Sequence, residues 1–148
     1  MTAADPLFLG LDVGTTGTKC VVIDPRGSVV AEATAEHPVS YPKPGWAEQD
    51  PEDWWRSSVA ATRAALAKAA TKAPDAAARV EGIGLSGQMH GLVALDASGT
   101  VVRPAILWND SRSAAICEAL HEREPGLAML LRSTGNRVFP GFQAPKLL

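Results

Sequence analysis

The stretch Leu7–Lys19, LFLGLDVGTTGTK, decides how the chain begins to fold and what it can bind. An apolar run ends in the carboxylate of Asp12, a turn rich in Gly and Thr follows, and Lys19 adds a positive charge. Apolar residues resume at Cys20 and end at a second turn, Pro25–Gly27. The pattern predicts strand, turn, strand, turn, strand.

The first turn has the composition of a phosphate-binding loop. Glycines let backbone N–H groups approach phosphate oxygens, because no side chain blocks the approach. The hydroxyls of Thr15, Thr16 and Thr18 are further donors, and a carboxylate at a strand end suits Mg²⁺, which keeps most of its water. The stretch matches neither GxxxxGK[ST] nor GxGxxG. A β-hairpin with a flexible glycine turn is the alternative interpretation.

Composition narrows the class of protein. The 148 residues suffice for about one domain, and 46% hydrophobic with 20% charged residues is typical of a globular chain. A net charge of −2 without any basic stripe argues against nucleic acid and anionic membranes as partners. We find no run of about 20 apolar residues and no signal peptide. Cys20 and Cys117 lie in apolar segments without a CxxC motif, so we expect buried, reduced thiols in the cytoplasm rather than a reactive or metal-binding pair.

The order of predicted elements indicates an α/β fold. Antiparallel strands are expected at 7–12, 18–24 and 28–35. A helix from Pro51 to about 72 follows, with Trp54, Val59, Leu66 and many alanines on its apolar face. A short helical turn at 75–80 and a buried strand at 80–86 come next, and a later strand is expected to join the sheet in parallel. Later elements are strands at 92–96, from 101 and at 104–108, helices at 111–123 and 127–132, and a helix beginning at 146–148.

A second motif, GQMHG, follows the predicted strand 80–86 directly. Its two glycines allow a sharp bend, and Gln88 and His90 lie at the carboxyl end of a strand, where α/β sheets commonly bind ligands. The alternative is a bulge in which the histidine bonds the backbone.

The Asp-x-Gly-Thr pattern between the first two strands resembles the first phosphate loop of the sugar kinase/actin/Hsp70 superfamily, and within it the FGGY carbohydrate kinases. The resemblance implies a ribonuclease-H-like half-domain. It also implies that Asp12 orients Mg²⁺ and that Gly14, Thr15, Thr16 and Lys19 hold phosphates of ATP.

GQMHG is similar to the sugar-binding motif of the xylulokinase branch, which implies that Met89 and His90 contact the ketose; glycerol kinases carry Arg-Glu at this place. The segment 105–112, AILWNDSR, also resembles the family. There Trp108 is expected to be an aromatic wall for the sugar or a core residue. Asn109 and Asp110 are expected to touch hydroxyls or to cap the next helix. The family-like segment 45–55 is expected to be structural, and the family-like segment 139–148 is expected to be a loop leading into a helix.

The resemblance spans residues 1–148 and implies ATP-dependent phosphorylation of the 5-hydroxyl of D-xylulose. The length departs from the family, whose members are bilobal and several times longer. The catalytic Asp, the second phosphate loop and the adenosine pocket are expected in a missing C-terminal lobe. We therefore expect this N-terminal domain to be incomplete and inactive alone, with the sugar, ATP, that lobe and a second copy of the chain as candidate partners.

Other functions stay open. The chain could be a non-catalytic module that binds sugar or phosphate, or a structural half that pairs with a separately encoded C-terminal lobe. It could also belong to another FGGY kinase, for ribulose, gluconate or glycerol, although GQMHG argues against this.

Overall fold

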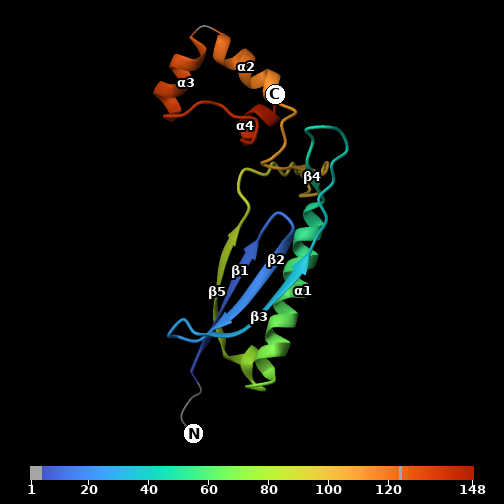
Figure 1. The fold of residues 1–148 in the computed structure, drawn as a ribbon, viewed down its shortest axis with the longest axis vertical. Helices are drawn as coiled ribbons and strands as arrows, with labels where there is room; N and C mark the ends of the chain where they lie inside the picture. Colours follow the sequence, from blue (N-terminus) through green and yellow to red (C-terminus); the bar gives the residue numbers. More distant parts are fainter. Residues whose placement is uncertain (1–4, 124) are drawn as a thin grey trace. The chain divides into compact units, whose positions relative to one another are not determined.

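A computed structural model describes residues 5–123 and 125–148. They form two compact units, which we treat separately (Figure 1). The sheet unit comprises residues 5–38 together with 52–88, and the loop unit comprises residues 39–51 and 89–148 apart from 124.

The sheet unit is a mixed sheet with one covering helix. Strands β1 (Leu7–Val13), β2 (Gly17–Ile23) and β3 (Val29–Glu36) are antiparallel neighbours, and β5 (Val80–Gly87) pairs with β1 in parallel, which gives the order β3-β2-β1-β5. The three opening strands and the parallel fourth strand are confirmed. Helix α1 (Pro51–Ala70) and the 3₁₀ helix η1 (Ala76–Arg79) form the predicted link between β3 and β5.

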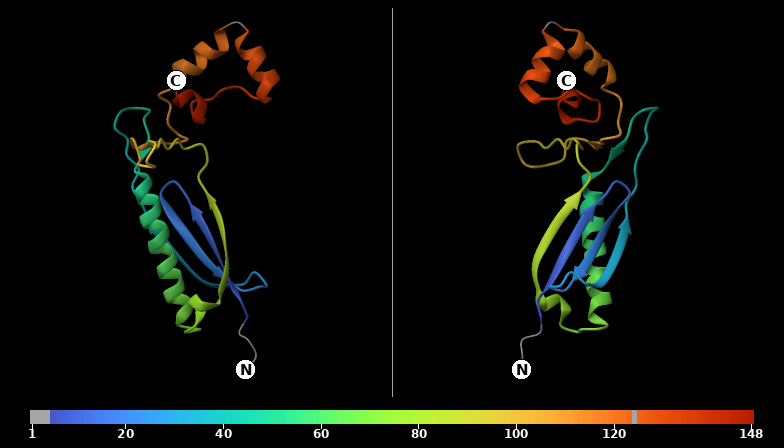
Figure 2. Two further views of the ribbon diagram at one scale, coloured as in Figure 1. Left: turned by 180° about the vertical axis from the view of Figure 1, so that it is seen from behind. Right: turned by 60° about the vertical axis from the view of Figure 1, so that its left-hand side comes forward.

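Helix α1 lies along one face of this sheet (Figure 2). Its buried stripe is Ser57, Ala61, Ala65 and Ala69, one residue every four, which pack near Leu7, Leu9, Cys20 and Val22 of the sheet. Alanines of the predicted apolar face thus form most of this stripe, whereas Trp54, Val59 and Leu66 of that face are only partly buried. Small side chains let the helix approach the sheet closely, which larger apolar residues would prevent.

The prediction that β5 is buried was wrong. Ile83 is 60% exposed and Leu85 78% exposed, because β5 is an edge strand of the described sheet and pairs on one side only. A shallow hollow of about 310 Å³ adjoins Leu11, Val21 and Leu85. The apolar side chains of the sheet unit are therefore incompletely covered.

The loop unit has little regular structure. Strands β4 (Glu48–Gln49) and β6 (Ala105–Ile106) pair antiparallel, and the helices are α2 (Ala114–Glu122), α3 (Gly126–Thr134) and α4 (Gln143–Lys146). The predicted strands at 92–96 and from 101 reduce to the isolated bridges Leu92–Ile106 and Leu95–Val101. The turn at 97–100 is held by Asp96, which accepts hydrogen bonds from the Ser98 and Thr100 amides.

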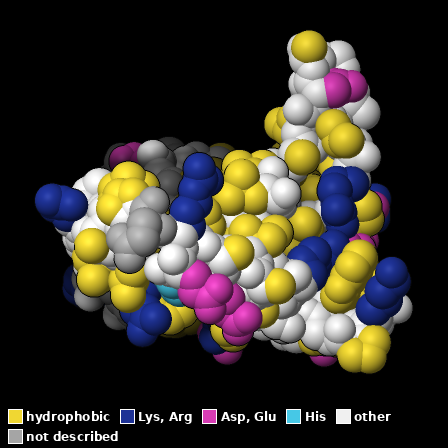
Figure 3. Space-filling view, turned by 90° about the horizontal axis from the view of Figure 1, so that it is seen from above, with side chains coloured by type: hydrophobic (Ala, Val, Ile, Leu, Met, Phe, Trp, Pro, Cys, Tyr) yellow, Lys and Arg dark blue, Asp and Glu magenta, His cyan; other side chains and the backbone are white. Residues whose placement is uncertain are grey.

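Surface hydrophobicity is extensive. Figure 3 shows hydrophobic side chains spread over much of one face, with basic and acidic groups between them. Among the described residues, no helix is long and apolar enough to cross a membrane. Both cysteines are buried and free, as predicted, and burial raises the pKa of each thiol.

Candidate functional site

The glycine-rich turn joins β1 to β2 as a tight hairpin. The Gly14 N–H donates to the Gly17 carbonyl (3.0 Å), and the strand register places Asp12 opposite Lys19. At Gly17 a Cβ atom would lie 2.9 Å from the Ala35 carbonyl oxygen. Glycine is needed here because the neighbouring strand leaves no room for a side chain.

A hollow of about 760 Å³ adjoins this hairpin. Asp12, Thr16 and Lys19 line it with Glu36 and His37. The residue predicted to orient Mg²⁺ therefore shares one surface with two of the predicted phosphate-site residues. Asp12 and Thr16 are exposed, while Gly14 and Thr15 build the turn itself. The Lys19 ammonium pairs with the Glu32 carboxylate (2.8 Å), and this hydrogen bond and charge lower the pKa of Glu32. A bound phosphate would compete with Glu32 for Lys19.

The surroundings of Asp12 fit a hydrated cation held by few protein ligands. No group of three or more His, Cys, Asp or Glu side chains among the described residues could hold a metal ion. Mg²⁺ is commonly bound by one or two carboxylates together with substrate phosphates and water. The exposed carboxylate of Asp12 meets that requirement without a protein cage.

Sequence reasoning missed a buried polar chain behind the turn. The Thr18 and Ser57 hydroxyls bond each other (2.9 Å), Ser57 bonds His37 Nδ1 (2.9 Å), and His37 Nε2 bonds the Gly14 carbonyl (3.0 Å). A carbonyl only accepts, so Nε2 is the donor in that bond. The predicted role of Thr18 as a phosphate donor is wrong, since its side chain is fully buried. Nothing in the sequence pattern connects His37 with a turn more than twenty residues earlier.

This chain fixes the turn from two sides. The His37 ring contacts the Gly14 carbonyl, and the backbone N–H of His37 donates to the Thr16 carbonyl (3.1 Å). Two carbonyls of the turn are therefore engaged with His37, which leaves the exposed side of the turn for a ligand.

Replacing Ser57 by Ala should destabilise the sheet unit by about 1–3 kcal/mol, because Thr18 and His37 lose a buried hydrogen-bond partner. Urea unfolding of the variant and the wild type measures the loss. The matched control is Thr71→Ala, which removes an exposed hydroxyl bonded only to its own helix end and should change stability by less than about 0.5 kcal/mol. Equal unfolding midpoints for Ser57→Ala and the control would contradict a stabilising role.

The predicted sugar-binding residues lie in the loop unit and are mostly accessible. Met89 is 67% exposed and Trp108 48% exposed, so the alternative of Trp108 as a core residue is wrong. Asn109 is exposed and lines a hollow of about 520 Å³ together with Tyr41–Ala47. His90 is partly buried and its ring packs on Phe142, with 4.7 Å between ring centroids. The backbone at Trp108 is also tightly packed, since a Cβ at Gly141 would lie 2.5 Å from the Trp108 carbonyl oxygen.

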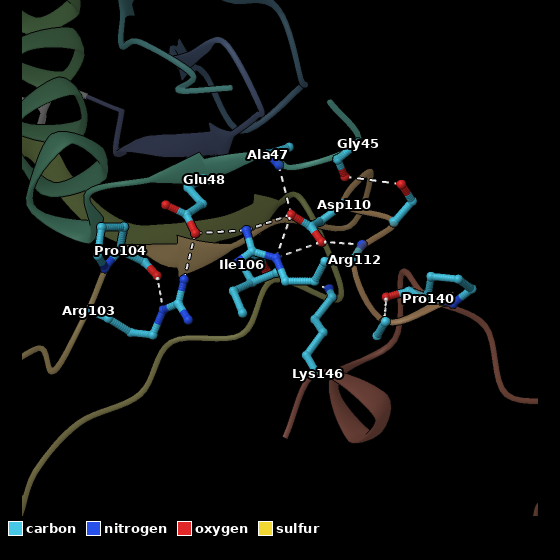
Figure 4. Close-up of polar contacts among 12 residues, drawn as sticks. Gly45, Ala47, Glu48, Arg103, Pro104, Ile106, Asp110, Arg112, Pro140 and Lys146 are labelled. Atoms are coloured by element: carbon cyan, nitrogen blue, oxygen red, sulfur yellow. Dashed lines mark hydrogen bonds and ion pairs between the residues drawn. The ribbon is translucent and has the colours of Figure 1, made fainter. Parts of the chain in front are cut away.

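Asp110 is different, because its side chain has no exposed surface. Its oxygens accept hydrogen bonds from the Ala47 N–H (2.7 Å), the Arg112 N–H (2.9 Å) and the Arg112 guanidinium (2.7 Å) (Figure 4). The prediction that Asn109 and Asp110 cap the next helix is wrong. Helix α2 begins at Ala114, and Ser113 precedes it without a side-chain cap.

Asp110 belongs to a buried ionic cluster. The Arg112 guanidinium also pairs with Glu48 (2.7 Å), and Glu48 pairs with Arg103 (Figure 4). The guanidinium carbon of Arg112 lies 3.7 Å from the centre of the Trp46 ring. Burial opposes ionisation of Asp110, but the hydrogen bonds from Arg112 and Ala47 outweigh it and lower the pKa of Asp110. The cluster ties segment 46–48 to the loop that carries Trp108 and Asn109.

Asp110→Asn should destabilise the loop unit by about 3 kcal/mol at neutral pH, because Arg112 loses a buried charge partner. The lowered pKa means that the Asp110 contribution is complete above the unfolded value of about 3.9 and is lost as the pH falls below it. The stability difference between wild type and variant should therefore shrink on acidification.

Urea unfolding from neutral pH to about pH 3 measures this difference. Asp75→Asn is the control, because its carboxylate is exposed and pairs with Arg79 at the surface. A difference that stays constant as the pH falls would contradict a charged Asp110 in the cluster.

Comparison with known proteins identifies the family. The sequence pattern of the N-terminal domain of the FGGY family of carbohydrate kinases matches residues 7–148. A xylulose kinase of Klebsiella pneumoniae is 44% identical over 142 residues, which is 96% of this chain and 28% of that protein. A glycerol kinase of Polaromonas is 40% identical over 142 residues, 95% of this chain and 27% of that protein.

Solved structures agree in fold. The crystal structure described as a "xyloylose kinase" from Brucella ovis has a TM-score of 0.80 and 46% identity, covering 95% of this chain and 28% of that one. The chain thus spans about 28% of the length of the relatives it matches first. The fold is the half-domain of the sugar kinase/actin/Hsp70 superfamily, as the resemblance implied. With its strand order, its glycine-rich hairpin and a family match over residues 7–148, this chain belongs to the FGGY family of carbohydrate kinases.

Proposed function

We propose that this chain is the N-terminal part of a kinase that transfers the γ-phosphoryl group of ATP to the 5-hydroxyl of D-xylulose, forming D-xylulose 5-phosphate. The observation that carries the proposal is GQMHG at residues 87–91, together with the 44% identity to a xylulose kinase. Such a reaction depends mainly on positioning the reactants and neutralising charge.

In this proposal the β1–β2 hairpin is the phosphate end. Asp12 holds a hydrated Mg²⁺. Phosphate oxygens of ATP are bound by Lys19, by the hydroxyls of Thr15 and Thr16, and by the backbone at Gly14. Support comes from the shared hollow that Asp12, Thr16 and Lys19 line. Because Lys19 pairs with a surface carboxylate, it can exchange Glu32 for a phosphate at small cost.

The sugar end consists of Met89, His90, Trp108 and Asn109. Exposure of Met89 and Trp108 supports a role in ligand contact, since each offers an apolar surface to one face of a sugar. We assign Asp110 to positioning instead of direct contact, because its carboxylate is engaged by Arg112 and Ala47.

The remaining parts of the kinase are proposed to lie outside this chain. The family resemblance implies that a C-terminal lobe contains the base that deprotonates the sugar hydroxyl. It implies the same location for the adenosine pocket. That lobe would also cover apolar side chains such as Leu85, which is 78% exposed. The buried free thiols of Cys20 and Cys117 suit a reducing, cytoplasmic location.

Selective binding of D-xylulose tests the sugar end. Titration calorimetry of the 148-residue chain should detect D-xylulose binding that is absent with xylitol or glycerol and lost in His90→Ala. His121→Ala is the matched control and should leave binding unchanged. Preference for glycerol would favour the glycerol kinase alternative, which the 40% identity to the Polaromonas enzyme keeps as a second candidate.

Turnover tests the division between lobes. The 148-residue chain with ATP, Mg²⁺ and D-xylulose should form no D-xylulose 5-phosphate above the uncatalysed rate, because the adenosine pocket is proposed to lie outside it and loss of a general base costs a further factor of about 10²–10⁴. Chromatographic detection of product gives the readout. Product formation by the purified chain would show that a base lies within these residues.

A further inference from the structure

The backbone of His90 has an unusual conformation. Its φ of 62° lies in the left-handed region, and it is the one non-glycine residue with positive φ in the part of the chain that the structure describes. A side chain with a Cβ adopts this conformation at a cost in free energy, so surrounding contacts must hold it. The cost falls on a residue of the candidate sugar-binding motif.

Lys146 supplies such a contact. Its Nζ donates to the carbonyl oxygens of His90 (2.8 Å) and Gly141 (2.6 Å), with a longer contact to that of Ile106 (3.5 Å). Figure 4 shows the Lys146 side chain extending from the C-terminal segment toward β6. An ammonium group has three donors, so these carbonyls use the whole capacity of the group.

Burial of the Lys146 ammonium group costs free energy, which its hydrogen bonds to carbonyl oxygens must offset. The side chain is partly buried, and burial lowers the pKa of its ammonium group. An ammonium removed from water is stable only when hydrogen-bonded. The three carbonyls provide those bonds, and one of them is the carbonyl of the strained residue.

The same segment also holds the His90 side chain. The Phe142 ring packs on the imidazole, and Phe139 packs edge-on against Phe142 with 5.6 Å between centroids. Gly141 meanwhile lies so close to Trp108 that a side chain would clash with the Trp108 carbonyl. The segment 139–146 thus contacts both His90 and the backbone of Trp108, two residues of the proposed sugar end.

We propose that Lys146 is a positioning residue, whose hydrogen bond to the His90 carbonyl fixes the left-handed backbone from which Met89 and His90 meet the sugar. Without this donor, residue 90 relaxes to negative φ, which rotates the adjoining peptide and redirects both side chains. The ligand's identity rests on the proposed function, but the control of the His90 backbone by Lys146 does not.

Lys146→Met tests the proposal, because it keeps the apolar stem and removes the ammonium. In isotope-labelled protein, the amide–Hα coupling and the Cα and Cβ shifts of His90 report φ, and the nuclear Overhauser contacts between His90 and Phe142 report the ring packing. We expect the left-handed signature to disappear and D-xylulose affinity to fall by about tenfold or more. Lys72→Met is the matched control, since the Lys72 ammonium likewise bonds a backbone carbonyl (Val30, 2.9 Å), and it should change neither readout.

A second variant separates positioning from folding. Lys146→Gln keeps a polar amide donor, and the Ala47 amide resonance, which depends on the bond to Asp110, shows whether the loop unit is folded. Loss of the His90 signature with the Ala47 resonance unchanged supports the proposal, in Lys146→Met or, where that variant loses the Ala47 resonance, in Lys146→Gln. A retained left-handed His90 in Lys146→Met overturns it, and so does loss of the Ala47 resonance in both variants, because Lys146 would then act on folding.

An error in the proposed function would give a different experimental result from an error in the role of Lys146. If the wild-type chain binds no D-xylulose, the sugar assignment fails, while the His90 couplings of Lys146→Met still decide whether Lys146 controls that backbone.

Discussion

The pairing of β1 on both of its edges is the constraint on which the sheet unit depends. β1 is antiparallel to β2 and parallel to β5, and this register places Asp12 between Lys19 and Ser86. Close pairing also dictates residue size, since a Cβ at Gly87 would lie 2.8 Å from the Val13 carbonyl oxygen. The position of the candidate phosphate turn, and the point from which the GQMHG segment departs, both follow from how β1 is hydrogen-bonded.

Both units position exposed groups by burying polar ones. In the sheet unit, Thr18, Ser57 and His37 form a hydrogen-bonded chain that ends at the carbonyl of Gly14. In the loop unit, Asp110 and Arg112 hold the segment that carries Trp108. A buried polar network is stable only when its members are paired, so it permits few arrangements and makes the adjoining surface rigid. Rigid presentation of a few exposed groups suits a reaction that depends on positioning.

Local patterns predicted most of the secondary structure. The first three strands, α1, the parallel strand and the helix near 127–132 were all expected, because alternation, helical periodicity and Pro or Gly boundaries act over a few residues. Predictions failed where long-range packing decides. Leu85 has the apolar character of a buried strand residue, yet it is exposed because β5 is an edge strand here. Asp110 has the character of a helix cap, yet Arg112 and Ala47 engage it.

The sequence by itself determined the family, the α/β class and the residue types of the candidate phosphate and sugar sites. It could do so because the DxGTT and GQMHG segments are contiguous, and their chemistry is readable without knowing what surrounds them. Only the tertiary structure decided which of these groups stay exposed and what holds them. His37 reaches Gly14 and Lys146 reaches His90 across 23 and 56 positions of sequence. Contacts over such separations follow from the path of the whole chain, which no local pattern contains.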